Sequence, residues 1–156
     1  MSRDEELSKY MYGDSDVMRA LAGEPVETRD PSHPTVTVTV KEGRNRTEVK
    51  KFKRLIICSG PRDAINVYFH SDAHVCYPHS EGVDIPARII FRLREIANEI
   101  FILYDIDKTG MKMANRLAMR FLDLKVIYLP QLLKQIRSPR TGKPCKDAEE
   151  YFNHFP

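Results

Sequence analysis

The chain has 156 residues, of which 42% are hydrophobic and 30% are charged, and its formal net charge is +3. This length is enough for one domain with a hydrophobic core and leaves little room for a second. No apolar run approaches the roughly 18 residues of a membrane-spanning helix. The acidic N-terminus also lacks the apolar segment of a secretory signal.

The three cysteines are widely spaced and form no C-x-x-C pair; they are Cys58, Cys76 and Cys145. This pattern argues against a structural zinc site and indicates reduced, buried thiols. We therefore expect a protein of the cytoplasm.

Charge is unevenly distributed along the chain. Residues 1–34 carry eight acids and four bases, so the positive excess lies in the remainder. Basic clusters at 41–54 and 134–146 dominate that excess. Such clusters are typical of surfaces that contact phosphate, although each one alone is equally consistent with a solvated surface.

The first third of the chain predicts a helix, a linker and a hairpin. Residues 5–22 could form a helix of poor periodicity, and the three prolines of 23–34 indicate an extended linker. Valine and threonine then alternate over 35–40, as in a half-buried strand, and 47–52 would return as its hairpin partner.

From residue 54 onward, short apolar runs alternate with amphipathic segments, which is the pattern of β-α-β units with a parallel sheet. We predict strands at 55–59, 74–77, 99–105 and 125–130, and helices at 61–71, 86–99, 109–123 and 146–155. The predicted fold is thus α/β, with a four-stranded parallel sheet, helices on both faces and an N-terminal β-hairpin. The predicted domains are 1–34, 35–53 and 54–156.

Ligands of such sheets bind at the carboxyl ends of the strands. The loops SGPRDA (59–64) and DIDKTG (105–110) follow the first and third strands of this unit, so we expect them at one edge. If Asp105 and Asp107 continue the strand, both carboxylates point to one spot, where a hard cation such as Mg²⁺ or Mn²⁺ would offset their repulsion. The alternative is a pair of solvated acids that cap the helix after them.

These motifs resemble the Toprim domain, the catalytic module of bacterial-type primases, type IA and II topoisomerases and some nucleases. The family's first strand ends in Glu-Gly with an Asp shortly after, and its third ends in D-x-D, usually followed by a Gly; here the segments read LIICSGPRDA and FILYDIDKTG. The late KDAEEYF (146–152) is similar to a motif of primases and phage-type primase–helicases. The resemblance covers roughly two thirds of the chain, 54–129 and on to about 153.

The resemblance implies a Toprim fold that performs metal-dependent phosphoryl transfer in DNA replication. It implies that Asp63, Asp105 and Asp107 are catalytic and that the last two hold Mg²⁺ or Mn²⁺. It also places Gly60, Asp147 and Glu150 at or near the site, although the last two could instead lie on the exposed face of a terminal helix.

The chain departs from the family at one position, because Ser59 stands where the family has its glutamate. A serine hydroxyl can hold a water or ligate weakly, but it is no base near neutral pH. Glu81 or Asp84, in the next loop by strand order, would be the nearest acids able to substitute.

Several other side chains have two interpretations each. Arg62, Lys108 and Lys146 would contact phosphate or would be ordinary surface cations. Tyr104 is better explained by packing in the sheet than by stacking on a base. Three histidines bracket the second strand of the unit, but their spacing does not favour zinc; they are His70, His74 and His79.

Two functional hypotheses follow. The first is a primase or primase–helicase Toprim module, of a phage or mobile element, that joins nucleotides on single-stranded DNA and works with a helicase or a template-recognition domain on the same or another chain. The second is a degenerate Toprim domain that binds nucleic acid without turnover, which Ser59 favours. A metal-free Rossmann-like fold is a third possibility, but the chain has no G-x-G-x-x-G for a dinucleotide.

Overall fold

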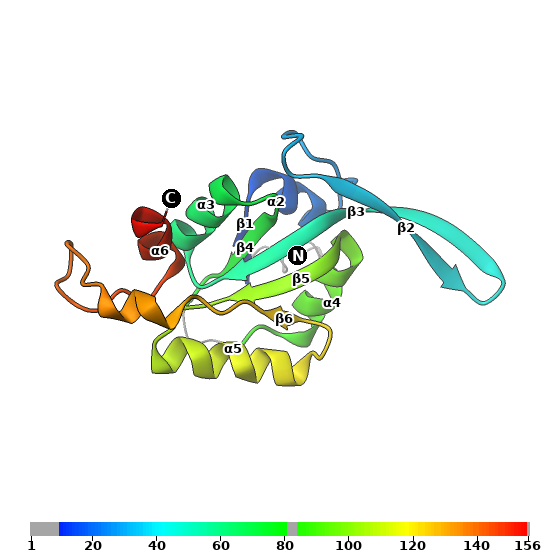
Figure 1. Ribbon diagram of the computed structural model, residues 1–156. Helices are drawn as coiled ribbons and strands as arrows, with labels where there is room; N and C mark the ends of the chain where they lie inside the picture. Colours follow the sequence, from blue (N-terminus) through cyan, green and yellow to red (C-terminus); the bar gives the residue numbers. More distant parts are fainter. Residues whose placement is uncertain (1–9, 81–83, 156) are drawn as a thin grey trace.

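The computed structural model describes residues 10–80 and 84–155. These residues form an α/β fold, as the sequence predicted, built on a mixed and mostly parallel sheet (Figure 1). The strands are β1 (Met11–Gly13), β2 (Thr35–Glu42), β3 (Asn45–Cys58), β4 (His74–Pro78), β5 (Ala97–Leu103) and β6 (Lys125–Val126). The helices are α2 (Ser15–Leu21), α3 (Pro61–His70), α4 (Ala87–Ile96), α5 (Lys108–Arg120), the 3-10 helix η1 (Gln131–Gln135) and α6 (Ala148–His154).

The described sheet has six strands in the order β1-β4-β3-β5-β6, with β2 paired to β3. Strands β4, β3, β5 and β6 are mutually parallel, whereas β1 and β2 pair antiparallel with β4 and β3. The sheet is therefore larger than the four strands predicted. Strand β1 accounts for one difference: it falls in the segment predicted as a helix, and the side chain of Met11 is wholly buried in the core.

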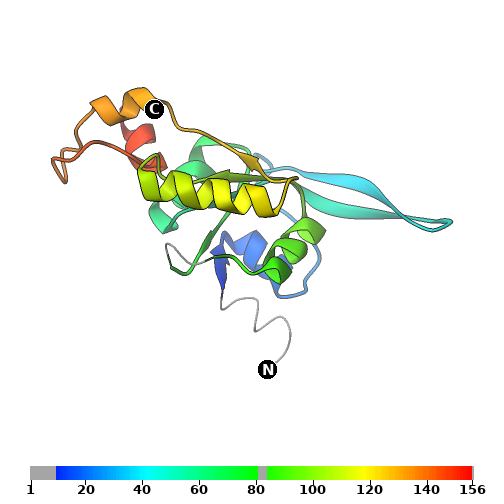
Figure 2. The same cartoon turned by 90° about the horizontal axis from the view of Figure 1, so that it is seen from below.

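The hairpin and the central sheet share one strand. Residues 45–52 of β3 pair with β2, and from Phe52 onward the same strand pairs with β5. The expected boundary at residue 54 thus falls inside a continuous strand. Figures 1 and 2 show the β2–β3 ribbon projecting from the body at the end opposite α6.

A second correction concerns the helix predicted over 86–99. Helix α4 ends at Ile96, and β5 begins at Ala97 without an intervening loop. The pairing of Ala97 with Phe52 draws these residues into the sheet, so tertiary pairing overrides the local helical pattern.

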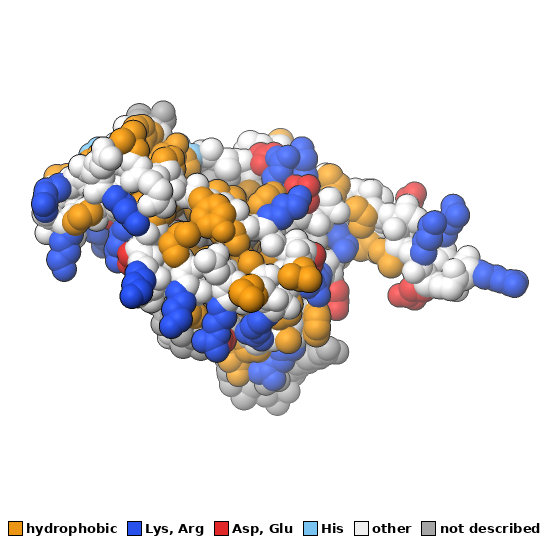
Figure 3. All heavy atoms as spheres, turned by 60° about the horizontal axis from the view of Figure 1, so that its bottom comes forward, with side chains coloured by type: hydrophobic (Ala, Val, Ile, Leu, Met, Phe, Trp, Pro, Cys, Tyr) orange, Lys and Arg blue, Asp and Glu red, His pale blue; other side chains and the backbone are white. Residues whose placement is uncertain are grey.

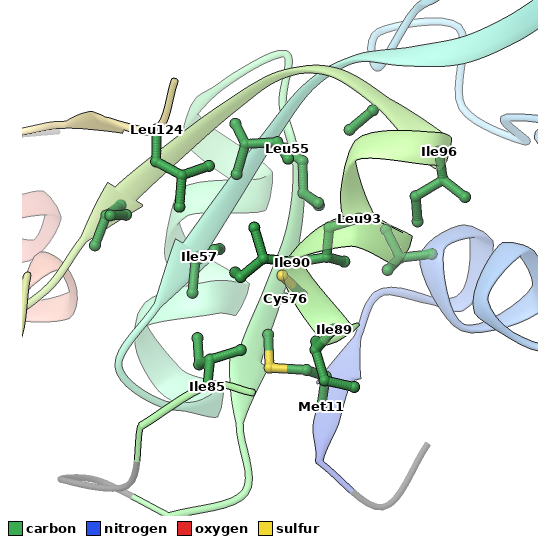
Figure 4. Close-up of a cluster of buried hydrophobic side chains, with 14 of the residues drawn as sticks. Met11, Leu55, Ile57, Cys76, Ile85, Ile89, Ile90, Leu93, Ile96 and Leu124 are labelled. Atoms are coloured by element: carbon green, nitrogen blue, oxygen red, sulfur yellow. The ribbon is translucent and has the colours of Figure 1, made fainter. Parts of the chain in front are cut away.

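The two faces of the sheet are covered by different helices. Leu55 and Ile57 of β3 face α2, α4 and α5 in one core (Figure 4), whereas Ile56 and Cys58 face α3, η1 and α6 in the other. This alternation is the period of two of a β-strand. Leu55 is fully buried, so its truncation to alanine would cost about 2–5 kcal/mol.

Figure 2 shows α2 and α4 on one side of the sheet and η1 and α6 on the other. The three cysteines are free and buried, as the sequence predicted. Among the described residues, no helix is long and apolar enough to cross a membrane.

Candidate metal centre

The site begins where β3 and β5 end. Ser59 follows β3 directly, and Asp63 lies in the first turn of α3, which Pro61 opens. The Ser59 hydroxyl oxygen lies 2.7 Å from Oδ2 of Asp63 and 3.0 Å from Oδ1 of Asp105. Because a hydroxyl carries one proton, Ser59 can donate to only one of the two carboxylates at a time.

Asp147 supplies a third carboxylate from the far end of the chain. Single oxygens of Asp63, Asp105 and Asp147 all lie within 4.8 Å of one another. The backbone N–H of Glu149 donates to Asp63 Oδ1 at 2.9 Å, which fixes the start of α6 against α3. We call Asp63, Asp105 and Asp147 the acidic centre.

Asp107 lies outside the acidic centre. Strand β5 ends at Leu103, so the alternation of a strand does not continue to Asp107. Its Oδ1 instead accepts a hydrogen bond from the N–H of Gly110 at 2.7 Å and caps α5. The alternative interpretation, a helix-capping acid, therefore describes Asp107 but not the buried Asp105.

Asp105 and Asp107 nevertheless both form ion pairs with one side chain of the protein, Lys146. Lys146 Nζ lies 3.5 Å from Asp105 Oδ2 and 3.3 Å from Asp107 Oδ2. The carbonyl of Lys146 accepts a hydrogen bond from the N–H of Ile106 at 2.7 Å, so its backbone is tied to the same loop. An ammonium group thus lies where the sequence predicted a metal ion between the two acids.

Gly110 explains the glycine of DIDKTG. A Cβ at this position would lie 2.3 Å from the carbonyl oxygen of Asp105, which is closer than any real contact. Only glycine therefore lets α5 begin so near the chain that carries Asp105. The glycine is required by packing at the site, since its φ does not lie in the left-handed region.

Two acids of the centre have raised pKa values. Burial, followed by the charge of Asp63, raises the pKa of Asp105 to about 6, although Ser59 and Lys146 oppose the shift. Burial and the neighbouring acids, Asp63 foremost, raise the pKa of Asp147 to about 7 against the hydrogen bond from Glu150 N–H. Burial lowers the pKa of Lys146, but its hydrogen bond with Asp107 and the charge of Asp105 raise it by more.

Burial and the mutual repulsion of the acids both favour an added proton or a cation at the acidic centre. Three carboxylates share one serine proton, the backbone N–H groups of Glu149 and Glu150, and a lysine 3.5 Å from Asp105. A hard divalent cation such as Mg²⁺ or Mn²⁺ suits a donor set made of carboxylate oxygens. The residues present therefore fit a metal ion.

The remaining predicted residues surround this centre or lie apart from it. Gly60 is the extended N-cap of α3, and Arg62 is exposed in the first turn of that helix. Lys108 is exposed at the first residue of α5. Glu150 is half-buried in α6, and its Oε2 is buried without a hydrogen-bond partner among the described residues.

The two acids considered as substitutes for the family glutamate do not join the centre. Glu81 lies outside the described residues. Asp84 is exposed and pairs with Arg116 of α5 at 3.0 Å. The third carboxylate of the centre comes instead from Asp147.

The three histidines have separate environments. His74 is buried beside Asp14, His70 stacks on Phe152, and His79 stacks on Tyr12. They do not form one ligand set, in keeping with the spacing argument against zinc. Tyr104 is half-buried and packs against the core that faces α4 and α5.

A search of protein-family models and a search of curated proteins both found no match to this chain. The functional interpretation therefore depends on the geometry of the acidic centre and on the motifs that build it.

Proposed function

We propose that this chain is a Toprim-like domain of a DNA primase or primase–helicase-like protein. It would bind Mg²⁺ or Mn²⁺ at the acidic centre and act on nucleotide or nucleic-acid phosphates. The observation that carries the proposal is the convergence of Asp63, Asp105 and Asp147 at the carboxyl ends of parallel strands. That edge is where ligands of α/β sheets bind.

The architecture around the centre supports the same interpretation. Strands β4, β3, β5 and β6 are parallel, and the two loops that resemble Toprim motifs follow β3 and β5, which are adjacent. The third motif, KDAEEYF, supplies Asp147 at the N-terminus of α6. Three segments distant in sequence thus meet at one edge in the order that the resemblance implies.

The chemistry assigned to each residue follows from its environment. A bound ion would supply charge stabilisation to the attacking and leaving oxygens of a phosphoryl transfer. Asp63 and Asp105 would hold it, and Ser59 would orient their oxygens through its hydroxyl. Asp147, whose pKa is about 7, is suited to accept and return a proton near neutral pH, the role for which the family glutamate is missing.

A cleft along α6 could admit a phosphate-bearing ligand. It has a volume of about 350 Å³ and is lined by residues 138–140 and by side chains of α6, among them Glu149 and Glu150. Arg140 reaches to 4.0 Å from Glu149 at this cleft. The basic segment 134–146 thus approaches the acidic centre, which would bring a nucleotide or single-stranded DNA within reach.

A second candidate is a degenerate domain that binds nucleic acid without turnover. Ser59 favours it, because the serine removes a carboxylate and neutralises part of the remaining charge through hydrogen bonds with Asp63 and Asp105. In that case the metal would organise the site without driving a reaction. A helicase or a template-recognition domain would remain a partner of either version.

Calorimetric titration of Mn²⁺ tests the proposal. We expect saturable binding in the wild type, loss of binding in Asp105→Asn, and unchanged binding in the matched control Asp84→Asn, whose acid is exposed and paired elsewhere. Absence of binding in the wild type would overturn the metal centre.

Primer synthesis on single-stranded DNA with Mg²⁺ then separates the two candidates. Activity that Asp147→Asn abolishes, with Mn²⁺ binding largely kept, supports the enzyme and the role of Asp147. Binding without activity, restored by Ser59→Glu, supports the degenerate domain.

A further inference from the structure

Helix α5 carries an oblique row of basic side chains. Lys108, Lys112, Arg116 and Arg120 recur at every fourth residue and are all exposed, and the helix contains no acid. Figure 3 shows a row of basic side chains on the face over α5. We call these four residues the α5 stripe.

The spacing of the α5 stripe works against the helix that bears it, although Arg120 lies in the last turn, where the helix dipole favours a cation. Residues four apart are neighbours on a helix, so each successive pair places like charges together, which destabilises a helix by a few tenths of a kcal/mol. Lys108 also lies in the first turn, where the helix dipole disfavours a cation. A row of like charge on an exposed helix can attract an external anionic partner.

Among the described residues, one member of the stripe has an internal counter-charge and another has only a backbone carbonyl as its partner. Arg116 pairs with Asp84 at 3.0 Å, and Arg120 donates to the carbonyl of Ile85 at 3.3 Å. Lys108 and Lys112 form no ion pair with any carboxylate of residues 10–80 and 84–155. These two lysines are at the end next to Asp107 and the acidic centre.

The cations of the stripe are evenly spaced. A rise of 1.5 Å per residue puts successive members about 6 Å apart along the helix axis. A polynucleotide backbone is likewise a regular line of single charges, and cations that follow it release its condensed counterions.

Exposed aromatic rings flank the stripe. Tyr128 is 57% exposed and its hydroxyl lies 3.4 Å from Oδ1 of Asn115 in α5. At the far end, Phe91 is 54% exposed and its ring lies 6.4 Å from that of Phe121, over which Arg120 is placed. Basic lines with neighbouring aromatic rings suit single strands, because unpaired bases can stack on the rings.

We propose that the α5 stripe binds the backbone of single-stranded nucleic acid, with Tyr128 and Phe91 as stacking surfaces. The stripe leads to the acidic centre, because Lys108 follows Asp107 directly. The inference extends the proposed function by naming the surface and the form of nucleic acid. Binding to the stripe does not itself require a metal ion.

Fluorescence polarisation of labelled dT20, with EDTA present, tests the stripe separately from the metal centre. We expect Lys108→Gln/Lys112→Gln to weaken binding about tenfold at low salt and to reduce the salt slope by about 1.4, which corresponds to two lost contacts. Tyr128→Leu should weaken binding by about fivefold or more. A matched control, Lys41→Gln/Arg46→Gln, removes the same charge from paired residues of the β2–β3 ribbon and should have little effect.

The comparison of the stripe and ribbon variants tests whether binding is specific to α5. Equal losses in the stripe and ribbon variants would overturn the inference in favour of non-specific attraction. Tighter binding of a 20-base-pair duplex, or of phosphatidylserine vesicles, would also overturn it, and rU20 beside dT20 tells RNA from DNA. Asp105→Asn separates the two proposals: retained dT20 binding with lost Mn²⁺ binding supports both, whereas wild-type dT20 binding without any Mn²⁺ binding supports the stripe alone.

Discussion

Two groups of closely spaced titratable side chains occur in the described residues, and they satisfy their charges in different ways. One lies beside β1 and the other is the acidic centre at the ends of β3 and β5. The group beside β1 consists of Asp14, Asp16 and His74. By residue type and distance alone, either group could bind a metal ion.

The group beside β1 is supplied with donors from within the fold. Asp14 accepts hydrogen bonds from the N–H groups of Asp16 and Val17, which cap α2, and from the N–H of Val75 in β4. Asp16 pairs with Arg19 and accepts from the N–H of Arg29. These acids stabilise the junction of α2 and β4, so no ion is needed to explain them.

The acidic centre has fewer donors for its three carboxylates: the Ser59 hydroxyl, the N–H groups of Glu149 and Glu150, and the Lys146 ammonium group. Asp63 and Asp105 share the single proton of Ser59, and the pKa values of Asp105 and Asp147 are raised to about 6 and 7. An acid cluster is therefore a candidate binding site when the protein's own hydrogen-bond donors and cations do not neutralise its carboxylates. When they do, the cluster is a structural feature. The predictions below test that distinction.

The largest expected effect is on the group beside β1. Asp14→Ala removes the cap of α2 and leaves the N–H of Val75 without its carboxylate partner. We expect the free energy of unfolding to fall by about 3 kcal/mol, measured by urea denaturation at pH 7. A loss below about 1 kcal/mol would show that this group is not structural.

Metal affinity of the acidic centre should depend on pH. A proton on Asp105, whose pKa is about 6, must leave before its carboxylate can bind an ion. We expect Mn²⁺ to bind about tenfold more tightly at pH 8 than at pH 5, measured by calorimetry in buffers of different ionisation enthalpy. A pH-independent affinity would contradict the charge argument.

Stability without metal should respond in the opposite sense. The folded pKa of Asp147 is about 7 and its ordinary value is 3.8, so the folded state binds its proton more tightly and loses stability as pH rises from about 4 to about 7. Asp147→Asn removes this loss and still caps α6. After allowance for the half-exposed position, we expect the variant to be about 1 kcal/mol more stable than the wild type at pH 8, with no gain near pH 4. Thermal melts at both pH values check the sign.

The smallest predicted effect concerns Lys146, which serves as the internal cation of Asp105 and Asp107. Lys146→Met should raise Mn²⁺ affinity about threefold, since an exposed charge that competes for the same oxygens is removed. Lys143→Met is the matched control, because Lys143 is also exposed but forms no ion pair among the described residues. Weaker binding in Lys146→Met would show that the lysine supports the ion instead.

Local sequence patterns were sufficient to predict the central parallel strands and the edge at which their loops meet. The apolar runs before Ser59 and Tyr104 form adjacent parallel strands, and the loops after them meet at one edge, since parallel strands end on the same side. The pairing of Asp63 with Asp105 beside Ser59 follows from that rule.

Other features required contacts between distant residues. Asp107 caps a helix because β5 ends two residues before Asp105, and that end depends on how far β5 pairs with β3. Residues 97–99 were predicted as the end of a helix but form a strand, because they pair with β3 from Phe52 onward. The hydrophobic periodicity of the sequence predicts neither the end of β5 nor its first residue.

By itself, the sequence determined the α/β class and the edge of the sheet at which the loops after β3 and β5 meet, because hydrophobic period and loop chemistry are local properties. Only the tertiary structure decided which acids meet. Asp147 joins Asp63 across 84 positions because α6 packs on α3, and Glu149 N–H fixes that contact. The raised pKa values of Asp105 and Asp147 depend on the same packing. The burial and the neighbouring carboxylates that cause them exist only when the three segments are packed together.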